Sequence, residues 1–170
     1  MTGSPTLPVD DPAALDRAAE ALLAGGVVVL PTDTVYGVAA LPTDPQAMAE
    51  VFDRKGRSQA TPIAVLCADR DQALDLAEPA AAARARSVAE RWWPGPLTLV
   101  LPRRAGTDLH LGEPATTIGL RVPDHELVQA LARRVGPIAT TSANRHGEPT
   151  PATAAEAAAS VDRLDQLVVG

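Results

Sequence analysis

Short apolar runs alternate along the chain with longer segments in which alanine, leucine and arginine recur at helical spacing. The apolar runs are rich in β-branched residues and are bounded by proline, glycine or aspartate, which is typical of strands buried on both faces of a sheet. The predicted strands are residues 27–30, 62–67, 97–101, 116–122 and 137–141. The predicted helices are residues 12–24, 44–54, 69–77, 79–92 and 124–135, followed by a weaker alanine-rich helix after residue 151. This alternation predicts an α/β fold in a single domain, with polar residues gathered at the ends of strands.

Aspartate-proline pairs mark the starts of the first two helices. Asp11 and Asp44 are each followed by proline, a sequence in which the aspartate caps the helix and the proline occupies its first turn. Gly25 is expected to close the first helix and Gly56 the second. Asp124 is expected to cap the fifth helix.

Composition limits the classes of function. The 170 residues are 46% hydrophobic and 21% charged, with 2% aromatics and a formal net charge of −6. A nonspecific nucleic-acid binder usually presents a basic face and stacking rings, so the composition does not indicate one. The apolar runs are far shorter than a membrane span, and the N-terminus lacks the pattern of a signal peptide, so we expect a cytoplasmic protein. The single cysteine, Cys67, lies in an apolar run, where a buried core thiol is expected rather than a nucleophile.

A hydroxyl-rich turn directly follows the first buried strand. Residues 31–37 read Pro-Thr-Asp-Thr-Val-Tyr-Gly and place four polar side chains at the end of that strand. The closing Gly37 lets the backbone turn or approach a ligand closely. The turn formers alone also fit an ordinary surface loop. For Asp33, a turn-forming contact and a metal contact are open alternatives.

Only one of the 15 basic residues is a lysine, Lys55, in the sequence Arg-Lys-Gly-Arg at the end of the second predicted helix. A lysine ammonium is a compact, movable charge whereas arginine is a rigid fork, so this lone lysine indicates an anion-binding role. The alternative is a helix end whose cations complement the helix dipole. If Arg121 and Arg145 converge on this cluster, an acidic protein would hold one positive cleft for a small anionic ligand.

Several common catalytic patterns are missing from the sequence. There is no Gly-x-x-x-x-Gly-Lys-Ser/Thr loop, no Gly-x-Gly-x-x-Gly after a strand and no Gly-x-Ser-x-Gly around Ser142. Three scattered histidines and one cysteine have no zinc-site spacing. Residues 92–98, Trp-Trp-Pro-Gly-Pro-Leu-Thr, are expected to form a core anchor followed by a turn.

Four segments together form a specific pattern, joined by Gly-Leu-Arg-Val-Pro at 119–123. They are the segment 31–37, Lys-Gly-Arg at 55–57, Trp-Pro-Gly-Pro-Leu-Thr at 93–98 and Ser-Ala-Asn at 142–144. In identity, order and spacing they resemble the YrdC-like family, the threonylcarbamoyl-AMP synthases of the tRNA modification at adenosine 37. The resemblance covers nearly the whole chain. It implies a twisted mixed β-sheet with flanking helices that encloses a positively charged cavity.

The resemblance also implies a reaction. In that family L-threonine, bicarbonate and ATP give threonylcarbamoyl-AMP and pyrophosphate, and the product passes to a separate transferase assembly acting on tRNA. Catalysis then consists of positioning and of stabilising spread negative charge, with no covalent enzyme intermediate. Mg²⁺ is expected to accompany the triphosphate through phosphate oxygens and water, and no residue is assigned to a metal.

Roles for individual residues follow from the same resemblance. L-threonine is assigned to Thr32, Thr34, Tyr36, Arg121 and Thr140, with Arg121 on the carboxylate. ATP is assigned to Lys55, Arg57, Thr117, Ser142, Asn144 and Thr150, with Lys55 and Arg57 as the catalytic clamp on the phosphates.

The chain departs from the family pattern at three places. Thr61 stands where a basic residue is common, and Ser58 stands where a proline is common. Beyond Gly170, relatives continue into a Ser-Thr-Val segment that closes over the substrates. For residues 1–170 we therefore expect one YrdC-like domain, either cut short in this sequence or belonging to a shortened homologue with a pocket open on one side.

Two classes of function are left open. The leading hypothesis is the synthase, and the alternative is a non-catalytic or degenerate YciO-like module that binds nucleotide or RNA. Lys55 and Arg57 together with Ser-Ala-Asn favour the enzyme, because those paralogues tend to lack them. The resemblance further implies double-stranded RNA binding, transient contact with tRNA or the threonylcarbamoyl transferase complex, no membrane partner, and a monomer or homodimer.

Overall fold

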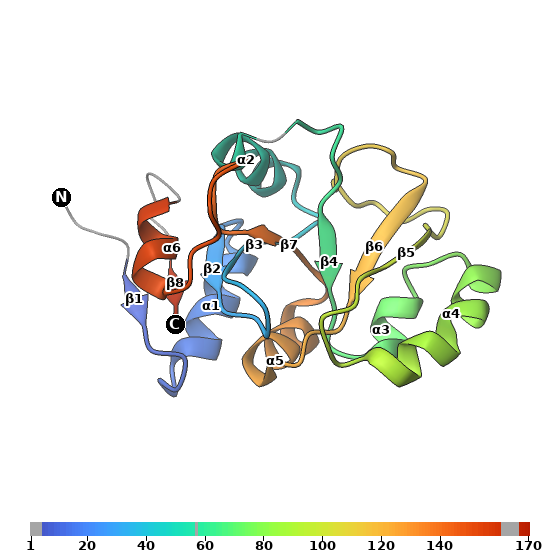
Figure 1. Ribbon diagram of the computed structural model, residues 1–170, viewed down its shortest axis with the longest axis horizontal. Coiled ribbons are helices and arrows are strands. Elements are labelled where there is room, and N and C mark those ends of the chain that lie inside the picture. The colour runs from blue at the N-terminus through green and yellow to red at the C-terminus, as the bar shows by residue number, and fades with distance from the viewer. Residues whose placement is uncertain (1–4, 57, 161–166) are drawn as a thin grey trace.

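The computed structural model describes residues 5–56, 58–160 and 167–170. Within these residues the chain forms six α-helices around one eight-stranded mixed sheet, which confirms the predicted α/β fold (Figure 1). The strands are β1 (Thr6–Leu7), β2 (Val28–Leu30), β3 (Gly37–Ala40), β4 (Ala64–Leu66), β5 (Leu99–Pro102), β6 (Thr117–Arg121), β7 (Ile138–Ser142) and β8 (Val168–Val169). The helices are α1 (Ala14–Leu23), α2 (Pro45–Lys55), α3 (Arg70–Leu74), α4 (Pro79–Trp92), α5 (Glu126–Val135) and α6 (Ala154–Ser160). In the described part of the chain, none of these helices is long and apolar enough to cross a bilayer.

The sheet mixes parallel and antiparallel neighbours in the order β1-β8-β2-β3-β7-β4-β6-β5. Strand β8 pairs parallel with both β1 and β2, and β4 pairs parallel with β6. Strand β7 lies antiparallel between β3 and β4. The first and last described strands therefore share one edge of the sheet (Figure 1), whereas β7 lies near its centre.

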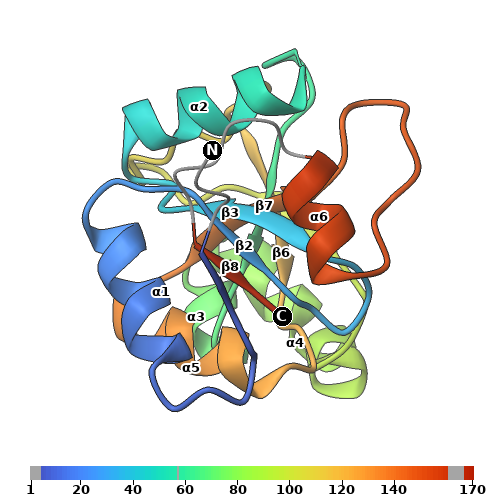
Figure 2. The same ribbon diagram turned by 90° about the vertical axis from the view of Figure 1, so that its left-hand side faces the viewer.

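Alternate residues of the central strands point into two separate cores, as the two-residue period of a strand requires. Val29 and Val65 pack in one core with residues of α2, α3 and α4. Val28 and Ile138 pack in the other core with residues of α1 and α5. Figures 1 and 2 both show α2 on one side of the strands and α1 beside α5 on the other. The sheet is thus the middle layer of the domain.

The aspartate-proline prediction is confirmed at the start of α2 and is wrong at the start of α1. The Asp44 side chain accepts hydrogen bonds from two backbone N–H groups of the first turn of α2, at 2.9 and 3.1 Å. Asp11 Oδ1 accepts one from the Ala13 N–H at 2.8 Å, but the N-cap residue of α1 is Ala13 and the helix begins at Ala14, because the backbone at Asp11 and Pro12 is not yet helical. Gly56 caps the end of α2 at φ 59°, a left-handed conformation that glycine adopts without strain.

The prediction that Asp124 caps the fifth helix was wrong. His125 is the N-cap residue of α5, and it makes no side-chain capping bond. The backbone is still extended at His125, with φ −149° and ψ 112°, so helical geometry begins one residue later than the aspartate requires.

Strand β3 was not predicted from the sequence. It reads Gly-Val-Ala-Ala, and glycine and alanine have little intrinsic preference for strands. Pairing with β2 on one side and β7 on the other decides its conformation, and all four residues are buried. The edge strand β1 is only two residues long, too short for a periodic pattern to reveal it.

Candidate functional site

Part of one sheet face carries only small side chains. Residues paired across neighbouring strands share a face, and the register pairs Gly37 with Ser142 and Thr140 with Ala64. Gly119 of β6 continues the row, because a Cβ built on it would lie 3.4 Å from Ala64 Cβ. Apart from the buried glycine of β3, these residues keep partial exposure, so this part of the sheet is free of bulky side chains.

The loop between β2 and β3 is organised by Thr32. Its hydroxyl accepts hydrogen bonds from the backbone N–H groups of Thr34 and Val35 at 3.2 and 3.1 Å, and it donates to the Val35 carbonyl at 2.7 Å. A hydroxyl used in this way fixes the turn, so the loop does not depend on an Asp33 turn contact. Thr32 therefore shapes the loop from which the next two side chains project.

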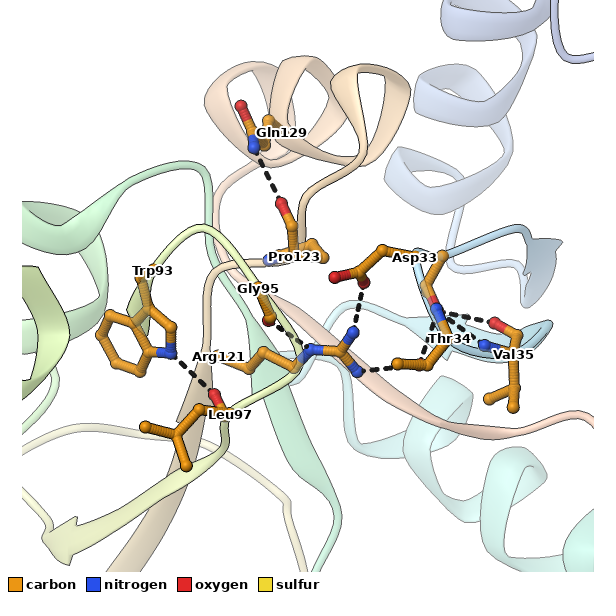
Figure 3. A network of polar contacts seen from close by, with 10 residues as sticks. Asp33, Thr34, Val35, Trp93, Gly95, Leu97, Arg121, Pro123 and Gln129 are labelled. Atoms are coloured by element: carbon orange, nitrogen blue, oxygen red, sulfur yellow. Dashed lines mark hydrogen bonds and ion pairs between the residues drawn. The ribbon is translucent and has the colours of Figure 1, made fainter. Parts of the chain in front are cut away.

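Arg121, the last residue of β6, reaches this loop (Figure 3). Its Nε donates to the Gly95 carbonyl at 3.0 Å, and one terminal nitrogen donates to Thr34 Oγ1 at 3.1 Å. The other terminal nitrogen forms an ion pair with Asp33. The Arg121 and Asp33 side chains are 12% and 15% exposed, so solvent screens this pair only weakly. The guanidinium is held in one orientation by three separate groups.

The turn before β5 supplies one of those groups. Trp93 is buried, and its Nε1 donates to the Leu97 carbonyl at 2.7 Å. The Gly95 N–H donates to the Val122 carbonyl at 2.8 Å, which leaves the Gly95 carbonyl directed at Arg121 (Figure 3). The core-anchor prediction is confirmed for Trp93, whereas Trp92 is 53% exposed, and the turn also positions the arginine.

Lys55 lies at the C-terminus of α2, which packs on the opposite side of the sheet from the small-residue face, and its side chain reaches the end of β7. Its side chain is buried, and its ammonium donates to the Ser142 carbonyl at 2.6 Å, to Ser142 Oγ at 2.8 Å and to Asn144 Oδ1 at 3.0 Å. The lone lysine therefore bridges the end of α2 and the end of β7. A compact ammonium suits this cluster of oxygens better than a planar fork.

Asn144 connects that lysine to the following loop. Its Nδ2 donates to the carbonyls of Arg145 and Glu148 at 3.0 and 2.7 Å. The loop and the end of α2 together line an open pocket of about 570 Å³. Its lining residues are Asp53, Arg54, Lys55, Gly56, Arg145, His146 and Glu148. Arg145 thus converges with Lys55, as the sequence suggested, whereas Arg121 belongs to the separate cluster around Asp33.

Tyr36 connects the loop between β2 and β3 to the loop that follows β7. Its carbonyl accepts a hydrogen bond from the Ala143 N–H at 2.8 Å. Its ring lies against Gly170, where an added Cβ would be 2.9 Å from the phenol oxygen. The Tyr36 side chain is therefore packed against the end of β8.

Two other predicted site residues make no contact with the Arg121 cluster or the Lys55 cluster among the described residues. Thr117 is half-buried at the beginning of β6, four residues before Arg121, and Thr150 is exposed in the loop before α6. Among the described residues, no contact ties Thr117 or Thr150 to Lys55 or Arg121. Arg57 lies outside the described residues.

Two groups near the predicted strands have shifted pKa values. Burial raises the pKa of the Cys67 thiol to about 12, with a smaller contribution from Asp69, as expected for a core thiol. Burial lowers the pKa of His125, while Asp33, Asp124 and Glu126 oppose the shift. His125 Nδ1 is buried and has no hydrogen-bond partner in the described part of the chain.

Sequence reasoning missed two members of the site. Asp33 was left as a turn or metal residue, but it is the ion-pair partner of Arg121. Asp33 is a carboxylate next to residues assigned to the amino acid, and this position was the signal in the sequence that could have indicated the ion pair. Nothing in the sequence indicated that the Gly95 carbonyl would face the same arginine.

Comparison with known families decides the relationship. The Sua5/YciO/YrdC family model, described as "Telomere recombination", matches residues 20–170. The chain belongs to this family. A threonylcarbamoyl-AMP synthase of Bacillus subtilis is 38% identical to it over 167 residues, which is 96% of the chain.

Solved structures of the Sua5/YciO/YrdC family agree with this fold. The structure titled as Pyrococcus abyssi Sua5 complexed with L-threonine superposes with a TM-score of 0.87 at 31% identity and covers 98% of the chain. Escherichia coli YciO superposes with a TM-score of 0.82 at 24% identity over 99% of the chain and 84% of its own, a likeness that shows the fold alone. The chain spans 48% of the B. subtilis protein and 51% of the P. abyssi chain.

Proposed function

We propose that this chain carries the catalytic site of a threonylcarbamoyl-AMP synthase, which acts on L-threonine, bicarbonate and ATP. The observation that carries the proposal is a pair of fixed charged clusters, one at the end of β6 and the other at the end of β7. Arg121 is fixed at one side with Asp33 and Thr34, and Lys55 is fixed at the other with Ser142 and Asn144. The likeness to synthases at 38% identity and to a threonine-bound Sua5 structure supports the same assignment.

The amino-acid end of the site is assigned to the Arg121 cluster. A guanidinium binds a carboxylate through parallel N–H donors, and Arg121 is already oriented by Gly95 and Thr34. We assign the threonine carboxylate to Arg121, with Thr32, Thr34, Tyr36 and Thr140 around the amino acid. Thr140 lies on the same sheet face as Ser142, between the two clusters.

The nucleotide end is assigned to the Lys55 cluster and its cavity. A triphosphate carries several negative charges, and the pocket of about 570 Å³ is lined by Arg54, Lys55 and Arg145 together with the carboxylates of Asp53 and Glu148. We assign the phosphates to Lys55 and Arg57, and the nucleotide to Ser142, Asn144, Thr117 and Thr150. The ammonium is held ready by oxygens of β7 and its loop.

The chemistry requires positioning more than covalent participation. The threonine ammonium first releases a proton to solvent, the resulting neutral amine reacts with bicarbonate to give a carbamate and water, and a carbamate oxygen then attacks the α-phosphorus of ATP. The bond from that phosphorus to the bridging oxygen breaks, and pyrophosphate leaves with the electron pair. Two fixed clusters, at the ends of β6 and β7, would hold the reactants in a defined relation, and the cations would stabilise the spread negative charge.

Mg²⁺ would enter with ATP and neutralise part of the phosphate charge. The described residues contain no group of three His, Cys, Asp or Glu side chains placed to hold a metal. Mg²⁺ is commonly bound through phosphate oxygens and water. We therefore assign no protein ligand to it.

The wider setting is part of the same proposal. A tRNA-modifying synthase would work in the cytoplasm and would pass its adenylate to a transferase assembly, with transient contact to that assembly or to tRNA. We propose this setting from the function rather than from a surface of the chain.

Pyrophosphate release from ATP, with each substrate omitted in turn, tests the proposal. Release should depend on both threonine and bicarbonate. Equal release without threonine would contradict the synthase assignment and would favour an ATP-binding or hydrolytic role.

A further inference from the structure

Asp33 and Arg121 form a charged pair at the place where the amino acid is assigned. We infer that Asp33 binds the α-ammonium of the amino acid while Arg121 binds its carboxylate, so that the pair selects a free zwitterion. The inference rests on the proposed function, because it specifies which residues recognise the charged groups of the amino-acid substrate.

Arg121 keeps donors available for a ligand. A guanidinium has five N–H groups. Three of them contact Gly95, Thr34 and Asp33, one from each nitrogen. One N–H therefore remains on each terminal nitrogen within the described residues, which is the number that a carboxylate with two oxygens uses.

Asp33 likewise keeps an acceptor available. Its Oδ1 contacts Arg121, whereas Oδ2 has no contact to any described residue. The carboxylate is only 15% exposed, and a carboxylate oxygen in a poorly hydrated place favours a cationic partner. Burial lowers the pKa of the nearby His125, and Asp33 is one of the carboxylates that oppose this shift.

An amino acid matches both groups at once. Its ammonium and carboxylate are attached to the same carbon. A carboxylate bound to Arg121 therefore brings the ammonium next to Asp33, the ion-pair partner of Arg121. The positive charge of the ammonium replaces part of the hydration that Asp33 loses when the ligand covers it. A ligand that lacks the amine would bring a second negative charge beside Asp33 with no compensation.

The test compares two ligands and two variants in the 170-residue chain without nucleotide. Calorimetry measures binding of L-threonine and of (R)-3-hydroxybutyrate, which is threonine without its amine, to the wild type, Asp33→Asn and Thr34→Val. The last variant removes one contact to Arg121 without changing the charge of the site. It is therefore the matched control for loss of arginine orientation.

The inference predicts a ligand-dependent effect. The wild type should bind threonine at least about tenfold more tightly than 3-hydroxybutyrate. Asp33→Asn should weaken threonine about tenfold and leave 3-hydroxybutyrate unchanged or tighter, while Thr34→Val should weaken both alike. The wild-type comparison stands even if Asp33→Asn does not fold.

Other outcomes overturn the inference. An equal loss of both ligands in Asp33→Asn would make Asp33 only a positioning residue for Arg121, and a gain of both would make it a competitor of the substrate carboxylate. If the wild type binds threonine and 3-hydroxybutyrate equally, the inference fails while the proposed function survives. If the wild type binds neither, the proposed amino-acid site fails as well.

Discussion

The side chain of Thr140 lies across the backbone of Gly37. A Cβ built on Gly37 would lie 2.4 Å from Thr140 Cγ2, far inside ordinary contact. The two residues lie on β3 and β7, which also deliver the two functional loops. Glycine is required here by close approach of the strands rather than by an unusual backbone angle.

Gly37→Ala should therefore destabilise the fold by about 1–3 kcal/mol, the usual cost of overpacking. Thr140→Ser removes the obstructing methyl group and keeps the hydroxyl, so the double variant should recover part of that loss. Urea denaturation of both single variants and the double variant measures the coupling. Strictly additive losses would show that the methyl contact does not decide the residue at position 37.

Replacement of Lys55 should separate charge from shape. Lys55→Arg keeps the charge but brings a planar fork into a space that holds one ammonium among three oxygens. We expect Lys55→Arg and Lys55→Met to lose similar amounts of transition-state stabilisation, about 2–4 kcal/mol. Steady-state kinetics of pyrophosphate release measures this loss.

Arg86→Met is the matched control for that experiment, because it removes a cation from an exposed ion pair with Asp71 away from the site. Its turnover should equal that of the wild type. Near-normal turnover of Lys55→Arg would mean that any cation suffices and that the scarcity of lysine carries no functional meaning.

Arg121→Ala should discriminate between the two substrates. Loss of the guanidinium removes a charged hydrogen-bonding partner from the amino acid, so threonine binding should weaken roughly tenfold to hundredfold. ATP binding should change little, since Lys55 and its cavity lie in the other cluster. Separate titrations measure both affinities, with the exposed Arg133→Ala as control. Equal losses for both ligands would place Arg121 in the scaffold or on the phosphates.

The sequence was sufficient for the elements with strong local signals. Runs of β-branched residues located β2, β4 and β6, and the aspartate-proline pair at Asp44 located the start of α2, whereas the pair at Asp11 placed the start of α1 too early. It was insufficient for β3, whose Gly-Val-Ala-Ala sequence becomes a strand through pairing on both sides. It also misplaced the cap of α5, because the chain remains extended through His125.

The candidate site divides in the same way. The motifs identified Lys55, Ser142 and Asn144, and the structure brings them into direct contact. The Asp33 pairing depends on how β6 and the β2–β3 loop meet in space, which no local pattern encodes. The assigned substrate roles of all these residues stay predictions.

The shifted pKa of His125 gives the fold a defined pH dependence. Burial lowers that pKa below its ordinary value of about 6.5, so the unfolded chain binds a proton more readily than the folded one. This residue's contribution should reduce stability as the pH falls through about 6.5 and should vanish well above it. His125→Asn should therefore lose less stability than the wild type between neutral and acidic pH, as measured by urea denaturation at each pH. Identical losses would contradict the lowered pKa.

Direct detection of the adenylate tests the central claim. The 170-residue chain, incubated with L-threonine, ATP, Mg²⁺ and carbon-13 bicarbonate, is expected to form threonylcarbamoyl-AMP that carries the labelled carbon. Mass spectrometry of the quenched reaction should show the labelled product in the wild type and its loss in Lys55→Met. Pyrophosphate formation accompanied by AMP alone, with no labelled adenylate, would contradict the account.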